Sequence, residues 1–429
     1  MEEIHFIGAL VGLAVGVFLI IKKLNPVAAL FIGTIVGVLV GGLSFSESLK
    51  YIISGSGSVM GINARVIAGG VLAGVLIESG AAEAIARTIV KKLGASRALL
   101  ALAISAAIVC ASGVFITVSI VIMAPIALSV ARQANVSKMA VLLAVCCGGK
   151  SGNIISPNPN AVTVAETFGV SLGQVMIAGI IPMLLGITLT VLLAGFLKNK
   201  GSNVTEEDVF DTNGEARYLP SFSKAIVGPV TAISLLMVNP ISNLLGIRLL
   251  QNFQLDAFFV LPIAAIVGAL AMGKGRNIIS YANSGILKMV PIVMILIGAG
   301  ALGGIINSSN LPEIVIAGIE KIGLPGVLLA PLSSTLMAAA AASTATGTML
   351  ACDSFGSAII MLGIAPLSAA VMVHAGAMFI DVMPHGNIFL ASKESFKISM
   401  KERLKLMPYE IAVGAIMVIS VTVLFGFVL

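Results

Sequence analysis

Charged residues are scarce in this sequence of 429 residues, and tryptophan is absent. Only 10% of the residues are charged, whereas about a quarter are charged in a typical soluble domain. Hydrophobic residues make up 58% of the chain, and the mean hydropathy is +1.10. This composition excludes a soluble globule and predicts an all-α polytopic membrane protein, which we expect in a bacterial inner membrane.

Patterns typical of nucleic-acid binding and of metal sites are equally lacking. The pI of about 9.2 does not indicate nucleic-acid binding, because the Lys and Arg residues occur in short clusters between apolar runs. The cysteines lie in apolar segments without the spacing of a zinc site or a disulfide framework: Cys110, Cys146, Cys147 and Cys352. The metalloprotease motif HExxH does not occur. We therefore expect no metal, no cofactor and no enzyme active site.

The basic clusters predict how the chain crosses the membrane. Lys22 and Lys23 separate the first two apolar runs, which places that turn in the cytoplasm and the N-terminus outside. Residues 45–58 are expected to form a short external connector before the third span. A span needs about 20 apolar residues, and the first three are expected at 4–21, 26–43 and 62–80.

The apolar segment between Arg97 and Arg132 is too short for two crossings, which need about 40 residues plus a turn. Both flanks are basic. We predict a re-entrant helical hairpin that enters from the cytoplasm, with its tip at Ser112 and Gly113. The alternative is one long tilted helix.

The segment 140–182 predicts a broken helix. An apolar helix is expected to stop at the pair Gly148 and Gly149, to give way to the polar stretch SGNIISPNPN, and then to begin again. Such a stretch is tolerated at membrane depth where it lines a wet cavity, and secondary transporters build their sites from broken helices. The alternative is an ordinary loop between two full helices.

The second half of the chain repeats the first. Residues 70–94 match 300–323, and 135–149 match 363–377, at offsets near 230. Because each half contributes five spans and one hairpin, the odd number of crossings predicts inverted repeats, ten spans in all and both termini outside. The remaining boundaries are a span at 172–197, the last span at 407–429, a first repeat at 1–197, a cytoplasmic linker at 198–224 and a second repeat at 225–429.

Ionisable residues inside spans are functional candidates by default. Lys150 is placed to attract a substrate carboxylate or to neutralise a helix end. Asp353 is predicted to carry a proton or to pair with Lys150, Asp381 occupies the position that Asn153 holds in the first patch, and His385 is placed to titrate with Asp381. His374 is expected to be a satisfied core residue. The remaining predicted substrate-binding residues come from the two patches and hairpin tips: Ser112, Gly113, Ser151, Asn153, Asn158, Asn160, Ser343, Thr344, Thr346 and Asn387.

Three stretches resemble the gluconate permease family of the ion transporter superfamily: ASGVFITVSIVIMAPIALSVARQANVSKMAVLLAV, SPNPNAVTVAETFGVSLGQVMIAGIIP and FKISMKERLKLMPYEIAVGAIMVI. The resemblance implies proton-coupled uptake of sugar acids, hydroxy acids or D-serine. It also implies an elevator in which hairpins and broken helices move together, commonly in a homodimer. The chain departs from the family at 150–160 and 380–384, where a Pro-Pro-His-Pro-Gly run and a Ser-His-Val-Asn-Asp run are usual, so another small carboxylate is expected in place of gluconate.

Two other functions fit parts of the pattern. The patches rich in Ser, Asn and Thr suit Na⁺ as well as a sugar acid, which leaves a sodium-coupled carboxylate transporter as the nearest alternative. A membrane subunit of an ion-pumping decarboxylase complex is an alternative of another class, and it requires a partner protein.

Overall fold

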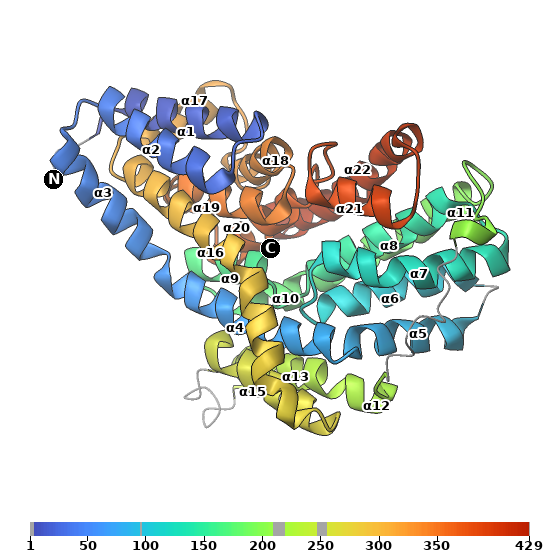
Figure 1. Cartoon of the computed structure of the whole chain (residues 1–429). Helices are drawn as coiled ribbons and strands as arrows, with labels where there is room; N and C mark the ends of the chain where they lie inside the picture. The colour runs from blue at the N-terminus through green and yellow to red at the C-terminus, as the bar shows by residue number, and fades with distance from the viewer. Residues whose placement is uncertain (1–3, 95–96, 209–218, 247–254, 429) are drawn as a thin grey trace.

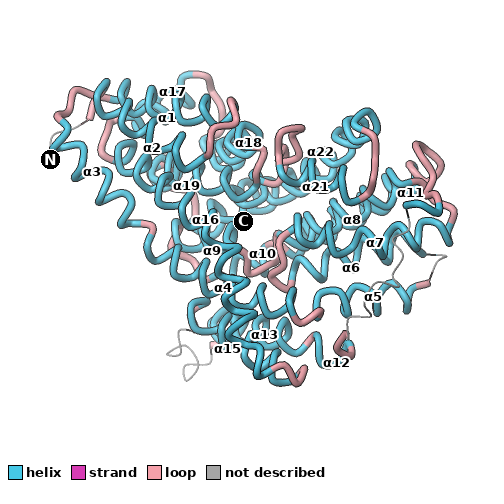
Figure 2. The backbone as a smooth tube through the Cα atoms, in the orientation of Figure 1, coloured by secondary structure: helices cyan, strands magenta, loops and turns pink. Residues whose placement is uncertain are grey.

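The computed structural model describes residues 4–94, 97–208, 219–246 and 255–428, and their regular secondary structure is helical (Figures 1 and 2). The helices of the first half are α1 Phe6–Ile21, α2 Pro26–Val40, α3 Phe45–Ser58, α4 Met60–Glu78, α5 Ala81–Leu93, α6 Ala98–Ala111, α7 Ile116–Ala134, α8 Lys138–Asn153, α9 Pro159–Thr167, α10 Leu172–Ala178 and α11 Ile180–Phe196. Those of the second half are α12 Phe222–Ala225, α13 Val227–Leu245, α15 Ala257–Ala271, α16 Ile278–Asn307, α17 Leu311–Lys321, α18 Leu329–Ala341, α19 Thr344–Met361, α20 Pro366–Ala377, α21 Asn387–Ser395 and α22 Met400–Val423.

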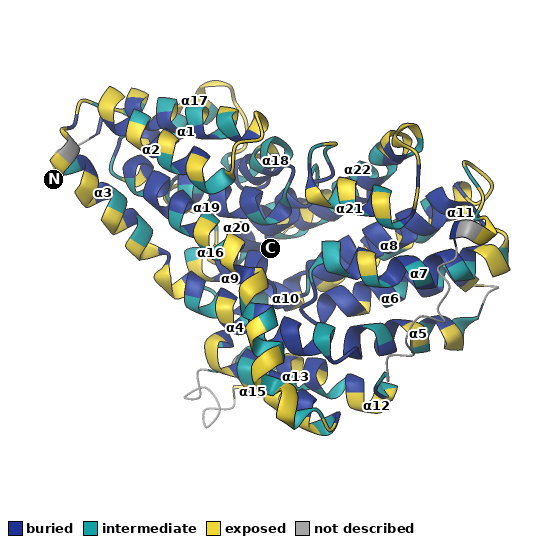
Figure 3. Ribbon diagram, viewed as in Figure 1, coloured by how far each residue is buried: buried dark blue, intermediate teal, exposed yellow. Residues whose placement is uncertain are grey.

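Several helices have the length and composition of membrane spans. Within the described ranges five are long and apolar enough to cross a membrane, or six if the bent pair α9 and α10 forms one span. These two helices meet at 111°, and seven shorter apolar helices accompany them. Large apolar side chains are exposed on the outer helices, as at Leu192, Ile279 and Leu287, while the interior is buried (Figure 3). The predicted class, an all-α polytopic membrane protein, is confirmed, and the count of ten spans stays a prediction.

The predicted external connector at 45–58 is instead the helix α3, which leads into α4 after Val59 alone. Ser44 and Glu47 form a capping box that starts the helix. Gly55 of this helix lies against α16, where small residues let two backbones approach closely. A β-carbon on Gly55 would lie only 2.2 Å from the carbonyl oxygen of Gly300.

The crossing of α3 and α4 with α16 is reciprocal. A β-carbon on Gly285 would lie 2.0 Å from the carbonyl oxygen of Gly70, and these residues stand 230 positions from Gly55 and Gly300, respectively. The contact of residue i with j is therefore matched by a contact between their counterparts, as a two-fold axis requires. From Gly55 in α3 to Gly70 in α4 the residue numbers rise, while those of their partners in α16 fall from Gly300 to Gly285. Helices α3 and α4 therefore run antiparallel to α16.

Two helical hairpins pack beside the broken helices. The predicted first hairpin is present as α6 and α7, joined by a turn at 112–115, so one long helix over this segment is excluded. Helices α18 and α19 form the second, with Ala342 at a φ of +48° in its turn. Both arms of the first hairpin lie along α8 (Figure 1). The second arm of each hairpin packs on the opposite half of the chain, α7 on α21 and α19 on α9.

The pair Gly148 and Gly149 does not end α8, which continues to Asn153. Helix α6 of the hairpin packs so closely on Gly148 that a β-carbon there would lie 2.4 Å from the carbonyl oxygen of Ala103. The second half repeats this contact 228 positions later, where a β-carbon on Gly376 would lie 2.4 Å from the carbonyl oxygen of Pro331. Glycine at these positions serves close helix packing and not helix termination.

The described part of the predicted linker is tied to neighbouring helices. Lys138 at the start of α8 forms an ion pair with Asp208, with 2.7 Å between Nζ and Oδ1. The backbone N–H of Ser202 donates to Glu402, which lies in the first turn of α22. Residues 209–218 of the linker lie outside the described residues, and the division of the chain at 197 and 225 stays a prediction.

Candidate substrate site at the two broken helices

The first break follows α8 and is organised by asparagine side chains. Asn158 accepts hydrogen bonds from the backbone N–H groups of Asn160 and Ala161, which caps the start of α9. Its amide nitrogen donates to the carbonyl and side-chain oxygens of Asn153 at 2.7 and 2.9 Å. The ordinary-loop alternative is excluded for this stretch, because its residues are buried and its two helix ends are held to each other by these bonds.

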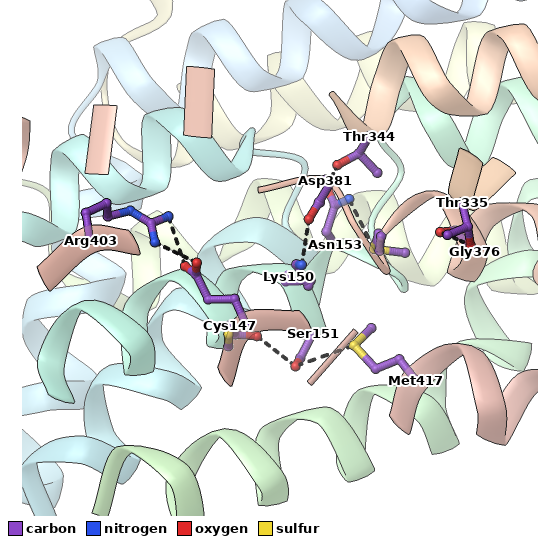
Figure 4. A network of polar contacts seen from close by, with 12 residues as sticks. Cys147, Lys150, Ser151, Asn153, Thr335, Thr344, Gly376, Asp381, Arg403 and Met417 are labelled. Atoms are coloured by element: carbon purple, nitrogen blue, oxygen red, sulfur yellow. Dashed lines mark hydrogen bonds and ion pairs between the residues drawn. The ribbon is translucent and has the colours of Figure 1, made fainter. Parts of the chain in front are cut away.

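The second break lies between Ala377 and Asn387 and carries Asp381. Lys150 in the last turn of α8 donates to Asp381, with 2.6 Å between Nζ and Oδ1. The hydroxyl of Thr344, at the tip of the second hairpin, donates to the other carboxylate oxygen at 2.7 Å. The Lys150 and Asp381 side chains are 3% and 0% exposed. One buried ion pair thus joins both broken helices and a hairpin tip (Figure 4).

The two breaks are also related by reciprocal contacts. Asn153 directs its amide nitrogen toward the sulfur of Met378 at 3.7 Å. Met378 stands 228 positions after Lys150, and Asp381 stands 228 positions after Asn153, so this contact is the counterpart of the ion pair. The same place in the two halves therefore carries a charged pair on one side and a neutral pair on the other.

A cavity of about 1030 Å³ opens beside the second hairpin tip. It lies between that tip, the second break, the middle of α16 and the turn from α1 to α2. Four of the predicted site residues line it: Ser343, Thr346, His385 and Asn387. Lys23 and Asn25 line it as well, and sequence reasoning missed them because the basic pair at 22 and 23 was interpreted only as a topology signal. No local pattern pairs that turn with residues more than 300 positions away.

The predicted residues of the first hairpin tip lie beside the first break and not in this cavity. A β-carbon on Gly113 would lie 3.9 Å from Pro157. The hydroxyl of Ser112 donates to the carbonyl of Val109, and that of Ser151 donates to the carbonyl of Cys147. The two patches do meet, at Lys150 and Asp381, but the structure does not gather all the predicted residues around one cavity.

Asp353 does not pair with Lys150, so the ion-pair alternative for Asp353 is wrong and Asp381 is the partner. Nine residues along α19 separate Asp353 from Thr344, which corresponds to about 13 Å along the helix axis. Asp353 faces a separate cavity with α3 and α16. His385 lines the larger cavity, whereas Asp381 is buried behind the hairpin tip.

Two further polar features were misjudged or missed. His374 is fully buried, but neither ring nitrogen has a hydrogen-bond partner among the described residues, so the expectation of a satisfied core histidine is wrong. Arg65 in α4 was not predicted as a site residue. It binds Asp256 through two nitrogens and forms an ion pair with Glu166 at 3.1 Å, beside a cavity of about 500 Å³.

Comparisons with known proteins agree over nearly the whole chain. The sequence model of the GntP family permeases matches residues 4–428. An uncharacterized transporter of Haemophilus influenzae is 47% identical, and the match covers 99% of each protein. The D-serine transporter DsdX of Escherichia coli is 24% identical, with 98% of each protein covered, and a gluconate permease of Bacillus subtilis is 26% identical, with 91% of this chain and 92% of that protein covered. The crystal structure of the Alcanivorax borkumensis YdaH transporter has the same fold, with a TM-score of 0.66, 17% identity and 89% of each chain covered.

Proposed function

The chain belongs to the GntP permease family, and from this premise we propose that it is a proton-coupled symporter of a small organic carboxylate such as a sugar acid or hydroxy acid. The family consists of permeases and not of enzymes, and the chain is a multi-pass protein of a bacterial inner membrane. Relatives are named for gluconate and for D-serine, two solutes that each carry a carboxylate and a hydroxyl group.

The observation that carries the proposal is the buried pair of Lys150 and Asp381. A lysine shielded from water is a strong site for a carboxylate, provided that its protein partner gives way. When Asp381 takes up a proton, Lys150 loses its counter-ion and accepts the substrate carboxylate in its place. Proton and substrate then bind together, because either one alone leaves a buried charge unpaired.

The hairpin tip supplies the access route. Thr344 holds Asp381 from the tip, and the adjacent Ser343 and Thr346 face the 1030 Å³ cavity. The positive charge of Lys23 at this cavity favours entry of an anion. In this proposal, movement of the tip opens the path from the cavity to Lys150, and His385 and Asn387 bind the polar groups of the substrate.

We further propose that the hairpins and broken helices move together as an elevator past a scaffold of α1 to α4, α13, α15 and α16. The reciprocal contacts at offsets of 230 and 228 support inverted repeats. If two antiparallel helices both cross the membrane and a two-fold axis exchanges them, that axis must lie in the membrane plane. A homodimer formed through the scaffold would keep that domain still while the other moves.

The test is the pH dependence of substrate binding by the purified protein. A thermal-shift screen of small carboxylates identifies a ligand, since a ligand that binds only the folded state raises its stability. The affinity of the wild type should then rise roughly tenfold per unit as the pH falls, because one proton binds with each substrate. Asp381→Asn should bind with an affinity that does not change with pH. Wild-type binding that ignores pH but requires Na⁺ would replace proton coupling with sodium coupling.

A further inference from the structure

A second cavity, of about 210 Å³, lies between α3, α16 and the hairpin arm α19, away from the candidate substrate site. Gly300, Gly303 and Gly304 line its α16 side without side chains. A β-carbon on Gly303 would lie 2.8 Å from the Cβ of Asp353, so Asp353 lies directly against α16. The residues that line it include one carboxylate and, in the described part of the chain, no basic side chain: Tyr51, Ser54, Gly55, Ser58, Gly300, Gly303, Gly304, Asn307, Ser308 and Asp353.

Asp353 is half-buried, and one of its carboxylate oxygens lacks the partner that a buried charge requires. Its Oδ2 atom is buried and accepts no hydrogen bond from any described residue. An ionised carboxylate in this position is expensive unless a cation or a set of donors compensates it. The cavity beside it provides the space for a cation.

The other oxygens around the cavity are suited to the same ligand. Helix α16 ends at Asn307, and the C-terminal turn of a helix carries a partial negative charge that favours cations. The hydroxyl of Ser58 donates its proton to the carbonyl of Gly55 at 2.7 Å, which leaves its lone pairs available as a ligand. The side-chain oxygen of Asn307 accepts from Ser357 at 2.7 Å and retains a second lone pair.

We propose that this cavity binds a hard monovalent cation, Na⁺, with Asp353 as its charged ligand and with oxygens of α3 and α16 in its coordination shell. Hard cations prefer carboxylate, hydroxyl and carbonyl oxygens, and a single carboxylate balances one positive charge but not two. The bound ion would hold the arm α19 of the second hairpin against α3 and α16. This inference does not depend on the identity of the substrate or on proton coupling at Asp381.

The experiment measures the thermal unfolding midpoint of the purified protein at constant pH and ionic strength, without any carboxylate, while NaCl replaces choline chloride. The wild-type midpoint should rise by roughly 2–4 °C in about 100 mM NaCl. Asp353→Asn should abolish this rise. Glu166→Gln is the matched control, because it removes a half-exposed acid elsewhere in the chain and should preserve the rise.

A second variant covers the case in which Asp353→Asn does not fold. Ser58→Ala removes one neutral ligand and should raise the NaCl concentration for half of the effect roughly tenfold. Direct binding of ²²Na⁺ should follow the same order of variants. The inference is overturned if the wild-type midpoint is the same in NaCl and choline chloride, if it responds only to pH, or if Ser58→Ala responds like the wild type.

Discussion

The ion pair of Lys150 and Asp381 makes a quantitative prediction about stability. The two side chains lie 2.6 Å apart and are almost fully buried, so removal of one partner leaves the other without compensation. Breaking a buried pair in this way costs about 3–5 kcal/mol. Asp381→Asn should show this full loss, because the amide still accepts the hydrogen bond from Thr344 but provides no charge for Lys150.

Lys150→Met should behave differently, since the carboxylate that it leaves behind can take a proton. For an ordinary aspartate, with a pKa near 3.9, protonation costs about 4 kcal/mol at pH 7 and about 1.5 kcal/mol at pH 5. A carboxyl that is neutral when folded and charged when unfolded gains stability as the pH falls. The destabilisation by Lys150→Met should therefore shrink between pH 7 and pH 5, while that of Asp381→Asn should not.

The double variant Lys150→Met with Asp381→Asn removes both charges and should recover most of the lost stability. Its control is the pair of Arg403 and Glu410, which is also 2.6 Å long and whose side chains are 0% and 1% exposed. Thermal unfolding in detergent and uptake by liposomes give the two measurements. The Lys150 double variant should be stable but inactive, whereas Arg403→Met with Glu410→Gln should retain transport.

Two results would refute this reasoning. If the losses of the single variants simply add in the double variant, the two charges do not stabilise each other. If the Lys150 double variant accumulates substrate like the wild type, the pair is structural and the proposed site is wrong.

Three further predictions concern packing, pH and topology. Gly148→Ala should destabilise the protein by about 1–3 kcal/mol, because the backbone of α6 blocks the added methyl group. The added methyl group of Gly149→Ala meets side-chain atoms alone, the sulfur of Cys110 at 3.2 Å and a methyl carbon of Ile116 at 3.8 Å, so this variant should lose less stability in thermal unfolding. Burial alone would raise the pKa of Asp208, but hydrogen bonds from Lys138 and the adjacent backbone hold that pKa below its usual value. The ion pair therefore stabilises above about pH 4 and is lost as the pH falls further, so the difference of about 1–3 kcal/mol between wild type and Asp208→Asn at pH 7 should disappear in acid unfolding. Asn199→Cys lies in the predicted cytoplasmic linker and should react with an impermeant thiol reagent only from the cytoplasmic side. The four native cysteines are buried, so labelling reports on position 199. Labelling from outside would contradict the inverted repeats.

The sequence predicted the class of fold and the elements around the breaks. Composition identified a membrane protein, the shortness of the segment after Arg97 indicated a hairpin, and the polar stretch 151–160 indicated a broken helix. These features depend on chain length and local polarity, which are readable without knowledge of the partners of each segment.

The errors in the helix boundaries have one physical origin, which is the packing of small residues between helices. Gly148 and Gly55 have low helix propensity, so a local reading ends the helix or replaces it with a connector. In the folded protein a neighbouring helix occupies the space that a side chain would fill, and this tertiary contact overrides the propensity. Nothing within α8 itself indicates that α6 lies against Gly148.

The pairing of Lys150 shows the corresponding limit for charges. Charge balance predicted that a lysine in a span needs an acidic partner, but the sequence offered both Asp353 and Asp381. Only the three-dimensional arrangement of the two breaks decides which of the two aspartates pairs with Lys150. The repeat favours Asp381, because this residue lies in the second break at the position that Asn153 holds in the first.

The two halves of the repeat contribute different side chains at counterpart positions of the candidate site. A two-fold arrangement of identical halves would place the same groups at both counterpart positions, and an asymmetric solute would then bind in two equivalent orientations. Here one position holds Lys150 with Asp381, and its counterpart holds Asn153 with Met378. In the proposed mechanism, the reciprocal contacts provide the symmetry that alternating access requires, while the difference between the charged and the neutral pair would give a carboxylate one end at which to bind.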